Sequence, residues 1–355
     1  METLEQSSNV SENKEIKTVI YGVGEIGSQI IKCLLKKNGI CIVGAIDKSP
    51  DKTGKDLGEL INLERKTGII ISSDPEEVLS QTQPDIVIVT TSSFLKDVYS
   101  QVLMAIKYGA NVISTAEELA YPHIVDRKLA DKLDNAAKRK GVTVLGTGIN
   151  PGFLMDTLVI TLSAVCQEIK RIKVCRVMNA AVRRIPFQKK IGAGLTVEEF
   201  TKKMEKRVIT GHVGLAQSVA MIADALGLKL EKVEVEPVKP IVAEKTVESP
   251  AIKVKPGCVA GLMQRAHGII NGEHMITLEF QAYIGAEKEY DSITIEGTPH
   301  VHEVITPCIH GDLGTVAVIV NMIPKVIKAS PGLKTMKDML LPSAALGDMR
   351  KYLQN

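Results

Sequence analysis

Three closely spaced glycines near the start of the chain constrain its fold more than any other feature. Gly22, Gly24 and Gly27 follow one apolar run and precede a helical pattern. A second apolar run, residues 40–46, stops at Asp47, 20 residues beyond the last glycine. Strand, glycine turn, helix and distant acid in this order are typical of a βαβ unit that holds a dinucleotide. The sequence therefore predicts a nucleotide-binding α/β domain.

Each glycine of this motif has a physical task. Gly22 permits the tight turn, Gly24 lets the backbone approach a diphosphate, and Gly27 lets the helix pack closely on the first strand. The N-terminus of that helix presents unpaired N–H groups and the positive end of its dipole to the diphosphate. We expect the cofactor to contact a continuous turn made of Gly22, Val23, Gly24, Glu25, Ile26 and Gly27.

The acid after the second strand bears on which dinucleotide is bound. The carboxylate of Asp47 can accept both ribose hydroxyls, which suits NAD and repels the 2′-phosphate of NADP. Lys48 lies beside it in the sequence and softens that preference. We therefore expect NAD or NADP as the cofactor. The alternative to a dinucleotide site is an accidental glycine turn in an ordinary α/β domain. In that case the strand, the turn, the helix and the acid would all have to coincide by chance.

Composition excludes several classes of protein. A chain of 355 residues is long enough for two domains with sizeable cores. Apolar residues make up 45% and charged residues 24%, which is ordinary for a globular protein. The formal net charge is +3, and the basic residues are dispersed rather than gathered in the patch that a nucleic-acid-binding surface needs. Apolar runs are too short for a membrane span, and residues 1–12 lack the apolar core of a signal peptide. We expect a cytoplasmic protein that binds neither nucleic acid nor membrane.

Short apolar runs alternate with longer helical stretches as far as about residue 147. Such alternation predicts a parallel, doubly wound Rossmann sheet with helices on both faces. The expected strands are 18–22, 40–46, 69–72, 85–90, 111–114 and 142–146.

Beyond this region the pattern changes to longer strands in which polar and apolar residues alternate. The pattern suits a sheet covered on one face, so we expect a second, α+β domain with a mixed open sheet. Near the end, the apolar helix Thr315–Ile323, interrupted at Pro324, is expected to pack on the nucleotide domain. The expected strands are 170–182, 231–243, 273–285 and 289–296, and the expected helices are 152–166, 196–205 and 211–226.

These patterns divide the chain into four segments. We expect a disordered tail at 1–13 and a dinucleotide-binding domain at 14–150. A substrate and dimerisation domain should follow at 151–308, and the helices of 309–355 should return to the nucleotide domain. Because an open sheet commonly pairs across a two-fold axis, we expect a homodimer.

Residues that follow strands are the first candidates for a site, because ligands bind beyond the carboxyl ends of the strands in a doubly wound sheet. Small hydroxyl residues there allow the nicotinamide ribose to approach closely. The candidates for cofactor binding are Thr90, Thr91, Ser92 and Thr115, and a second glycine-rich turn offers Thr147, Asn150 and Pro151 to the substrate.

Two adjacent acids after the strand 111–114 are the sharpest chemical clue. A carboxylate beside the nicotinamide is disfavoured unless a cationic ring or a cationic substrate offsets its charge. We therefore expect at least one of Glu117 and Glu118 to be catalytic. The alternative is structural, since acids also favour helix N-termini and a helix is expected near Tyr121.

Two histidines and an arginine are further candidates for binding the substrate. His212 lies between glycines at the expected start of a helix, and His267 lies in a polar stretch between elements. Either histidine can instead be a structural hydrogen bonder. Arg183, in a pair with Arg184, can bind a substrate carboxylate. No metal site is expected, because no carboxylate-histidine spacing accompanies the histidines between residues 300 and 310.

Several stretches together resemble the 2,4-diaminopentanoate dehydrogenases, a group that includes native amine dehydrogenases and is structurally related to dihydrodipicolinate reductase. The resemblance covers nearly the whole chain after the tail, and its most specific part is the run Ser-Thr-Ala-Glu-Glu-Leu-Ala-Tyr-Pro of residues 114–122. The other stretches are 21–27, 43–47, 54–59, 146–152, 211–214 and 310–315.

This resemblance implies NAD(P)-dependent oxidative deamination of an amine or diamino acid, with 2,4-diaminopentanoate giving 2-amino-4-oxopentanoate and ammonia. It implies an essential glutamate in the Glu117–Glu118 pair, with Glu117 the better match, and it implies Asn150 and His212 in the substrate pocket. A protonated amine cannot release hydride, so a base must first take a proton from it. We expect Glu117 to be that base.

Two other functions remain open at this stage. One is alcohol oxidation by an enzyme similar to homoserine dehydrogenase, a family that generally relies on a lysine, for which Lys189 and Lys190 are candidates. The other is a nucleotide-sensing regulator without activity. Release of ammonia during turnover separates amine oxidation from alcohol oxidation, and bound NAD without turnover indicates a sensor.

Overall fold

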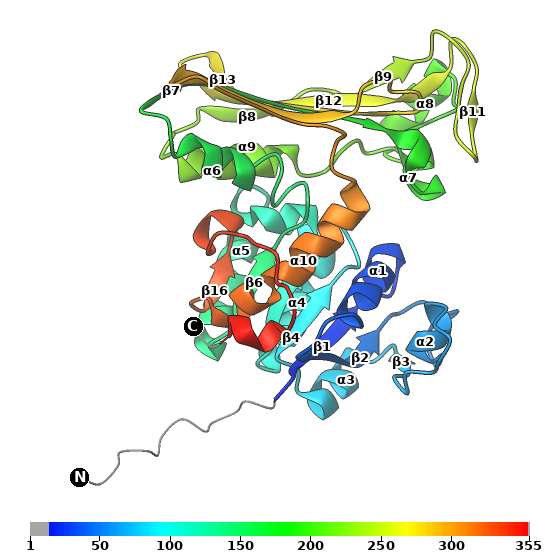
Figure 1. Cartoon of the computed structure of the whole chain (residues 1–355), viewed down its shortest axis with the longest axis vertical. Coiled ribbons are helices and arrows are strands. Elements are labelled where there is room, and N and C mark those ends of the chain that lie inside the picture. The colour runs from blue at the N-terminus through cyan, green and yellow to red at the C-terminus, as the bar shows by residue number, and fades with distance from the viewer. Residues whose placement is uncertain (1–13, 354–355) are drawn as a thin grey trace.

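The computed structural model describes residues 14–353, which form two large sheets with helices packed on and between them (Figure 1). The tail expected at residues 1–13 lies outside the described residues.

The first sheet has seven strands in the order β16-β6-β5-β4-β1-β2-β3, and each neighbouring pair is parallel. The predicted doubly wound Rossmann sheet is confirmed. Its strands are β1 (Ile16–Tyr21), β2 (Ile40–Ile46), β3 (Ile71–Ser72), β4 (Ile86–Val89), β5 (Asn111–Ser114), β6 (Thr143–Gly146) and β16 (Gly332–Lys334).

Helices cover both faces of this sheet with their apolar sides. On one face, α1 (Glu25–Leu34) packs beside α10 (Gly311–Lys328), where Ile30 and Ile31 join Ile319 in one buried cluster. The other face carries α3 (Pro75–Thr82), α4 (Leu95–Lys107) and α5 (Arg127–Lys140). Shorter helical segments are α2 (Leu57–Leu60), η1 (Glu117–Ala120), η2 (Pro122–Ile124), η4 (Met336–Asp338) and η5 (Met349–Tyr352).

The second sheet runs β15-β14-β7-β13-β12-β8, and β9 also pairs with β12. It is mixed, as predicted, because β7 and β13 are parallel whereas the other pairs are antiparallel. Its strands are β7 (Glu168–Asn179), β8 (Lys232–Val235), β9 (Lys239–Val242), β12 (Val259–Ile270), β13 (Glu273–Tyr283), β14 (Tyr290–Thr298) and β15 (Val301–Ile305). A separate ribbon pairs β10 (Val247–Glu248) with β11 (Lys253–Val254).

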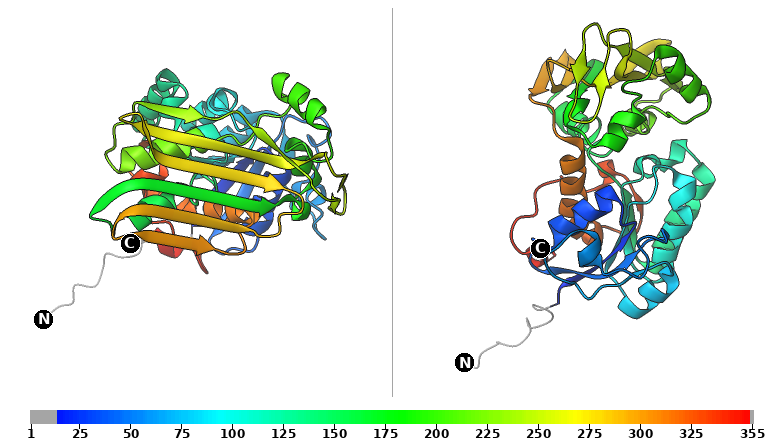
Figure 2. Two further views of the ribbon diagram at one scale, coloured as in Figure 1. Left: turned by 90° about the horizontal axis from the view of Figure 1, so that it is seen from above. Right: turned by 90° about the vertical axis from the view of Figure 1, so that its right-hand side faces the viewer.

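Helices cover only one face of the second sheet in the described part of the chain. The helices α6 (Thr157–Ser163) and α9 (Leu215–Ala225) lie beneath the sheet, on the side of the first domain (Figure 1). The segments η3 (Ala180–Val182), α7 (Ile185–Lys190) and α8 (Val197–Glu205) follow β7 in the chain. The left view of Figure 2 looks directly onto the opposite face of the strands, which is open.

One strand prediction in this sheet was wrong, and two strands, β12 and β15, were not predicted. The expected strand 231–243 is divided into β8 and β9, because Pro237 lacks the N–H that a ladder requires. The long strand β12 was missed, since glycines and polar residues interrupt its apolar pattern. His267 therefore lies inside a strand rather than between elements.

Helix boundaries also differ from the predicted ones. α10 continues past Pro324 to Lys328, because the apolar side chains of this region are buried on both sides of the proline. α6 begins only at Thr157, after a series of turns. α9 begins at Leu215, because Gly211 and Gly214 both have positive φ.

Within residues 14–353, none of the helices combines the length and the apolar character that a membrane crossing requires.

Candidate active site

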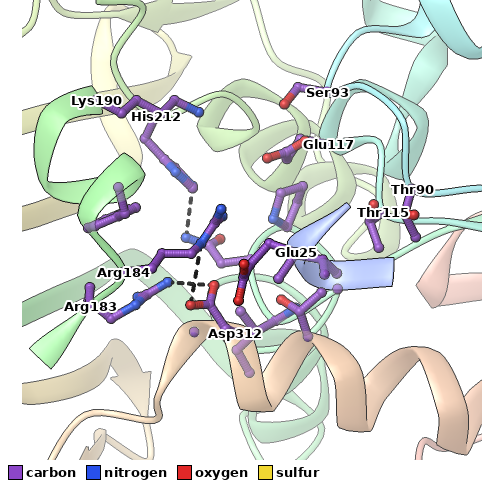
Figure 3. A pocket seen from close by; sticks show the side chains of 18 of the residues that line it. Glu25, Thr90, Ser93, Thr115, Glu117, Arg183, Arg184, Lys190, His212 and Asp312 are labelled. Carbon is purple, nitrogen blue, oxygen red and sulfur yellow. Dashed lines mark hydrogen bonds and ion pairs between the residues drawn. The ribbon is translucent and has the colours of Figure 1, made fainter. Parts of the chain in front are cut away.

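A cavity of about 400 Å³ lies at the carboxyl ends of the first sheet's strands and extends to the covered face of the second sheet. The first sheet contributes the turns after β1, β4, β5 and β6 to its wall. The second domain contributes side chains from β7, β13, α7 and the loop before α9. Figure 3 shows ten of the lining side chains by name.

The glycine turn has the geometry that a dinucleotide requires. Gly22 has a φ of +105°, and a Cβ on Gly27 would overlap the carbonyl oxygen of Gly22, so α1 packs directly on the turn. A Cβ on Gly24, by contrast, would meet no atom of residues 14–353 within 4 Å. Gly24, Glu25 and Ile26 line the cavity at the N-terminus of α1. This open backbone next to a helix N-terminus fits a diphosphate.

Asp47 lies beside the glycine turn, and its carboxylate already has several partners. It accepts hydrogen bonds from the backbone N–H groups of Val23 (2.8 Å) and Ser49 (2.9 Å), and it pairs with Lys52 at 3.0 Å. Burial acts to raise the pKa of Asp47, but these contacts outweigh burial and lower it. The cation that pairs with Asp47 is therefore Lys52, not Lys48, whose side chain is exposed.

The hydroxyl residues after β4 and β5 line the cavity, where sequence analysis expected the cofactor. Thr90 donates its hydroxyl to the carbonyl oxygen of Gly22 at 2.6 Å, which ties the end of β4 to the glycine turn. Thr91, Ser92 and Thr115 also belong to the lining. The nicotinamide end of a dinucleotide on the glycine turn would lie against these small side chains.

The two adjacent glutamates occupy different environments. Glu117 lines the cavity, and Ser93 hydrogen-bonds to its carboxylate. Burial raises the pKa of Glu117, while the nearby Lys190 opposes that rise. Figure 3 shows Lys190 and Glu117 entering the cavity from opposite sides. A buried carboxylate with a raised pKa is suited to take up a proton.

Glu118 requires a correction, because its carboxylate is used structurally. It accepts a hydrogen bond from the backbone N–H of Leu95 at 2.7 Å, at the first residue of α4. The carboxylate thus satisfies an N–H group that the helix itself leaves unpaired. Glu118 therefore has the structural role at a helix N-terminus that was the alternative to a catalytic role. The helix concerned is α4, whereas a helix near Tyr121 was expected.

The turn after β6 and the loop before α9 meet next to Glu117. A Cβ on Gly214 would overlap the ring of Pro151 and would lie 3.5 Å from the Cβ of Glu117. The side-chain nitrogen of Asn150 is 3.0 Å from Nε2 of His212. Thr147 also lines the cavity, so every residue of this turn that was expected at the substrate lies in its wall.

Arginine side chains form another part of the wall. Arg183 donates to Asp312 at 2.8 Å, and Nε of Arg184 is 3.6 Å from the second oxygen of the same carboxylate. In the described residues, Nε of both arginines is buried without a hydrogen-bond partner. One carboxylate thus faces two guanidinium groups, which leaves this wall with an excess of positive charge.

His267 also requires a correction, because its ring is bonded within the second sheet. Nε2 is 2.9 Å from the Glu236 carboxylate, Nδ1 is 3.1 Å from the Thr277 hydroxyl, and the ring stacks on His274. The side chain lies on the sheet face opposite to the helices. His267 is therefore a structural hydrogen bonder, which was the alternative to binding the substrate.

Several lining residues were not predicted. Arg176, Met178 and Phe280 project from β7 and β13. The charge of Arg176 among apolar strand residues is a local signal that could have found it, whereas Met178 and Phe280 resemble other inward-facing strand residues. Asp312 lies in a stretch that sequence analysis quoted, but no role was expected for it. The sequence offered Lys189 and Lys190 equally as the lysine of an alcohol-oxidising enzyme. Of these two residues, Lys190 lines the cavity.

Across residues 14–353, no three His, Cys, Asp or Glu side chains are grouped as a metal ion would need.

Comparison with known proteins identifies relatives over almost the whole chain. Residues 153–355 match the family described as the 2,4-diaminopentanoate dehydrogenase C-terminal domain, and residues 16–119 match the N-terminus of dihydrodipicolinate reductase. The chain is 36% identical to the 2,4-diaminopentanoate dehydrogenase of Acetoanaerobium sticklandii over 96% of this chain and 98% of that protein.

Two amine dehydrogenases are also similar. The sequence of the enzyme from Streptomyces virginiae is 24% identical over 93% of this chain and 97% of that protein. The solved structure of the amine dehydrogenase from Mycobacterium smegmatis matches with a TM-score of 0.82 and 28% identity, covering 94% of this chain and 98% of the other.

Proposed function

This chain belongs to the 2,4-diaminopentanoate dehydrogenase family, and from that membership we propose that it oxidises a primary amine to a ketone and ammonia with NAD(P). The proposed substrate is 2,4-diaminopentanoate and the product 2-amino-4-oxopentanoate, with reductive amination of the ketone as the reverse reaction. The observation that carries the proposal is the half-buried carboxylate of Glu117, with its raised pKa, in the cavity that also contains the glycine turn.

The first domain would hold the cofactor. Gly24, Glu25 and Ile26 would receive the diphosphate at the start of α1, and Asp47 would lie at the adenosine ribose. Thr90 and Thr115 would lie against the nicotinamide end. When bound, NAD(P) accepts the hydride that leaves the amine carbon. Whether NAD or NADP is preferred depends on Asp47, whose charge Lys52 already offsets.

Glu117 would act as the base of the reaction. An amine is protonated near neutral pH, and only its neutral form has the lone pair that drives hydride release. The Glu117 carboxylate attracts the ammonium group and removes one proton from it. After Glu117 has passed that proton to solvent, water attacks the iminium that remains after hydride loss, and the same carboxylate orients this water and takes a proton from it. The carboxyl group then returns this proton to the nitrogen of the carbinolamine. Ammonia then leaves, and a ketone is formed.

The second domain would bind the remainder of the substrate. The excess positive charge of Arg183 and Arg184 over Asp312 supports binding of a substrate carboxylate at this part of the wall. Thr147, Asn150, Pro151 and His212 would enclose the reacting amine.

An assay with two readouts tests the proposal. Purified protein is incubated with amines, diamino acids and hydroxy acids, with NAD and with NADP, and NAD(P)H and ammonia are measured in the same samples. The proposal predicts equal amounts of both products with 2,4-diaminopentanoate. Reduced nicotinamide without ammonia would instead identify an alcohol dehydrogenase, for which Lys190 is the base that lines the cavity.

Two further expectations belong to this proposal. We propose that the protein is a homodimer through the open face of the second sheet (Figure 2), which light scattering combined with substitutions on that face would test.

We also propose a cytoplasmic location, because the reaction consumes the pyridine nucleotides that cells hold internally. Fractionation of cells that express the native gene would test this expectation.

A further inference from the structure

The amide of Asn150 is held in one orientation by its two neighbours. Its nitrogen lies 3.0 Å from Nε2 of His212 and 3.0 Å from the sulfur of Met155. A thioether sulfur accepts hydrogen bonds but has no hydrogen to donate. The edge of the amide that faces Met155 is therefore the NH₂ edge, and the same nitrogen faces His212.

His212 can act as the acceptor for that nitrogen only in its neutral form. Burial lowers the pKa of His212 to about 3, and the cations of Lys190 and Arg176 contribute to the shift. A neutral imidazole has one nitrogen that accepts and one that donates. With Nε2 accepting from Asn150, the ring proton resides on Nδ1.

The ring of His212 is also fixed in position. It stacks on Phe280 with a centroid distance of 4.3 Å and an interplanar angle of 11°. Its backbone N–H donates to the side-chain oxygen of Gln264 at 2.9 Å. His212 therefore presents its Nε2 lone pair from a defined place, and rotation of the ring would break the stack.

These contacts engage only the nitrogen of the Asn150 amide and, among the residues that the structure describes, leave its carbonyl oxygen unpaired. This oxygen is buried and has no hydrogen-bond partner in residues 14–353. Asn150 and Glu117 line the same cavity, and a Cβ added to Gly214 would lie 3.5 Å from the Cβ of Glu117 and would overlap the ring of the proline that follows Asn150. A buried acceptor without a partner, on a residue that lines the same cavity as the proposed base, points to a donor supplied by a ligand.

We propose that His212 is a positioning residue that turns the carbonyl oxygen of Asn150 toward the substrate nitrogen, so that the site selects amines over alcohols. This inference rests on the proposed amine oxidation. Glu117 and Asn150 then form a pair of acceptors, of which one can take up a proton and the other cannot.

The chemistry of the two substrate classes explains the selection. After Glu117 removes one proton, the amine nitrogen retains two N–H groups, and the iminium formed by hydride loss keeps both in one plane. One N–H donates to Glu117 and the other to Asn150. An alcohol has a single O–H, which it gives to Glu117, so the Asn150 oxygen would face a lone pair of the substrate. A site built for hydrogen bonding rejects an analogue that lacks the donor.

Three variants separate positioning from general structural effects. His212→Phe keeps the stack on Phe280 but removes the acceptor, His212→Gln restores a carbonyl acceptor, and Asn150→Leu removes the proposed contact itself. His123→Phe is the matched control, because this exposed histidine also contacts another ring, that of Tyr121, but is not among the described residues that line the cavity.

The experiment measures kcat and KM for 2,4-diaminopentanoate and for 2-amino-4-hydroxypentanoate. It also measures the dissociation constant of the amine for the enzyme saturated with NADH, by calorimetry. We expect His212→Phe and Asn150→Leu each to weaken amine binding by about 10- to 100-fold, the range for loss of one hydrogen bond to a charged group. The preference for amine over alcohol should fall by a similar factor. His212→Gln should recover most of the loss, and the His123 variant should match the wild type.

The double variant distinguishes action through Asn150 from independent action. Because His212 acts through Asn150, combining His212→Phe with Asn150→Leu should give no more than the larger single loss. Additive losses, or an unchanged amine preference in both single variants, would overturn the inference. Absence of amine turnover in the wild type would refute the proposed function, whereas the calorimetric comparison would still decide whether His212 and Asn150 position an amine.

Discussion

Replacing Glu117 by glutamine removes the proposed base with little other change. Glutamine has nearly the same size and can keep the hydrogen bond from Ser93, but it cannot accept a proton. General base catalysis contributes roughly 10²- to 10⁴-fold, so we expect kcat to fall by that factor, about 3–5 kcal/mol in activation free energy. Stability should not fall, because the variant removes a buried charge.

Glu118→Gln is the matched control for this variant. It changes the neighbouring carboxylate in the same way but leaves an oxygen to accept from Leu95. We expect nearly unchanged turnover and a loss of unfolding free energy below about 1 kcal/mol, from the missing charge at the helix N-terminus.

The assay follows NADH formation at saturating amine. Cofactor affinity is measured separately from the fluorescence of bound NADH, without interference from tryptophan, because the chain contains none. We expect both variants to bind NADH like the wild type. The reasoning is refuted if Glu117→Gln retains more than a tenth of the wild-type kcat, or if Glu118→Gln loses as much activity as Glu117→Gln.

The remaining predictions concern the pH profile, the glycine turn of residues 22–27, and Asp156, a buried acid that accepts hydrogen bonds from the Gly152 backbone N–H and the Ser218 hydroxyl. Lys190→Ala should move the acid limb of the pH profile of kcat/KM to higher pH, because Lys190 lowers the pKa of Glu117 and the base must be deprotonated. Gly24→Ala should preserve the melting temperature but weaken NADH binding, since its Cβ would occupy open space at the cofactor. Gly27→Ala should lower the melting temperature, because its Cβ would overlap the turn. Asp156→Ala should cost about 3 kcal/mol in urea unfolding, because buried donors lose their acceptor.

Each of these predictions has a control or a contradictory result. Lys189→Ala, next to Lys190 but outside the cavity wall in the described residues, should leave the pH profile in place. Equal melting temperatures for the two glycine variants would contradict the packing argument. Asp156→Asn retains one acceptor and should lose less stability than Asp156→Ala; an equal loss would show that charge rather than hydrogen bonding matters.

The nucleotide domain could be predicted from sequence because its information is local. The glycine turn, Asp47 and the strand ends each follow directly from a short pattern, and the parallel sheet then brings the strand ends to one edge. Only Lys48 was considered as the cation beside Asp47, because it is adjacent in sequence. Lys52 was not predicted, because the turn after β2 decides which lysine reaches the carboxylate.

The substrate side of the cavity was less predictable because it is assembled from distant segments. Arg176 and Phe280 lie on neighbouring strands that are separated by about a hundred residues in the sequence, and only the parallel pairing of β7 with β13 brings them together. The different environments of Glu117 and Glu118 depend on where α4 begins. His267 was misplaced because β12 carries glycine and polar residues that hide its strand pattern.

The most direct measurement of the central claim runs the reaction in reverse with labelled ammonium. The protein is incubated with 2-amino-4-oxopentanoate, NADH or NADPH and ¹⁵N-ammonium, and the product is analysed by mass spectrometry. The account predicts a diamino acid that carries one ¹⁵N atom at the former ketone carbon, and loss of that product in Glu117→Gln. An unlabelled hydroxy acid as the product, or labelled amine formed equally well by Glu117→Gln, would contradict it.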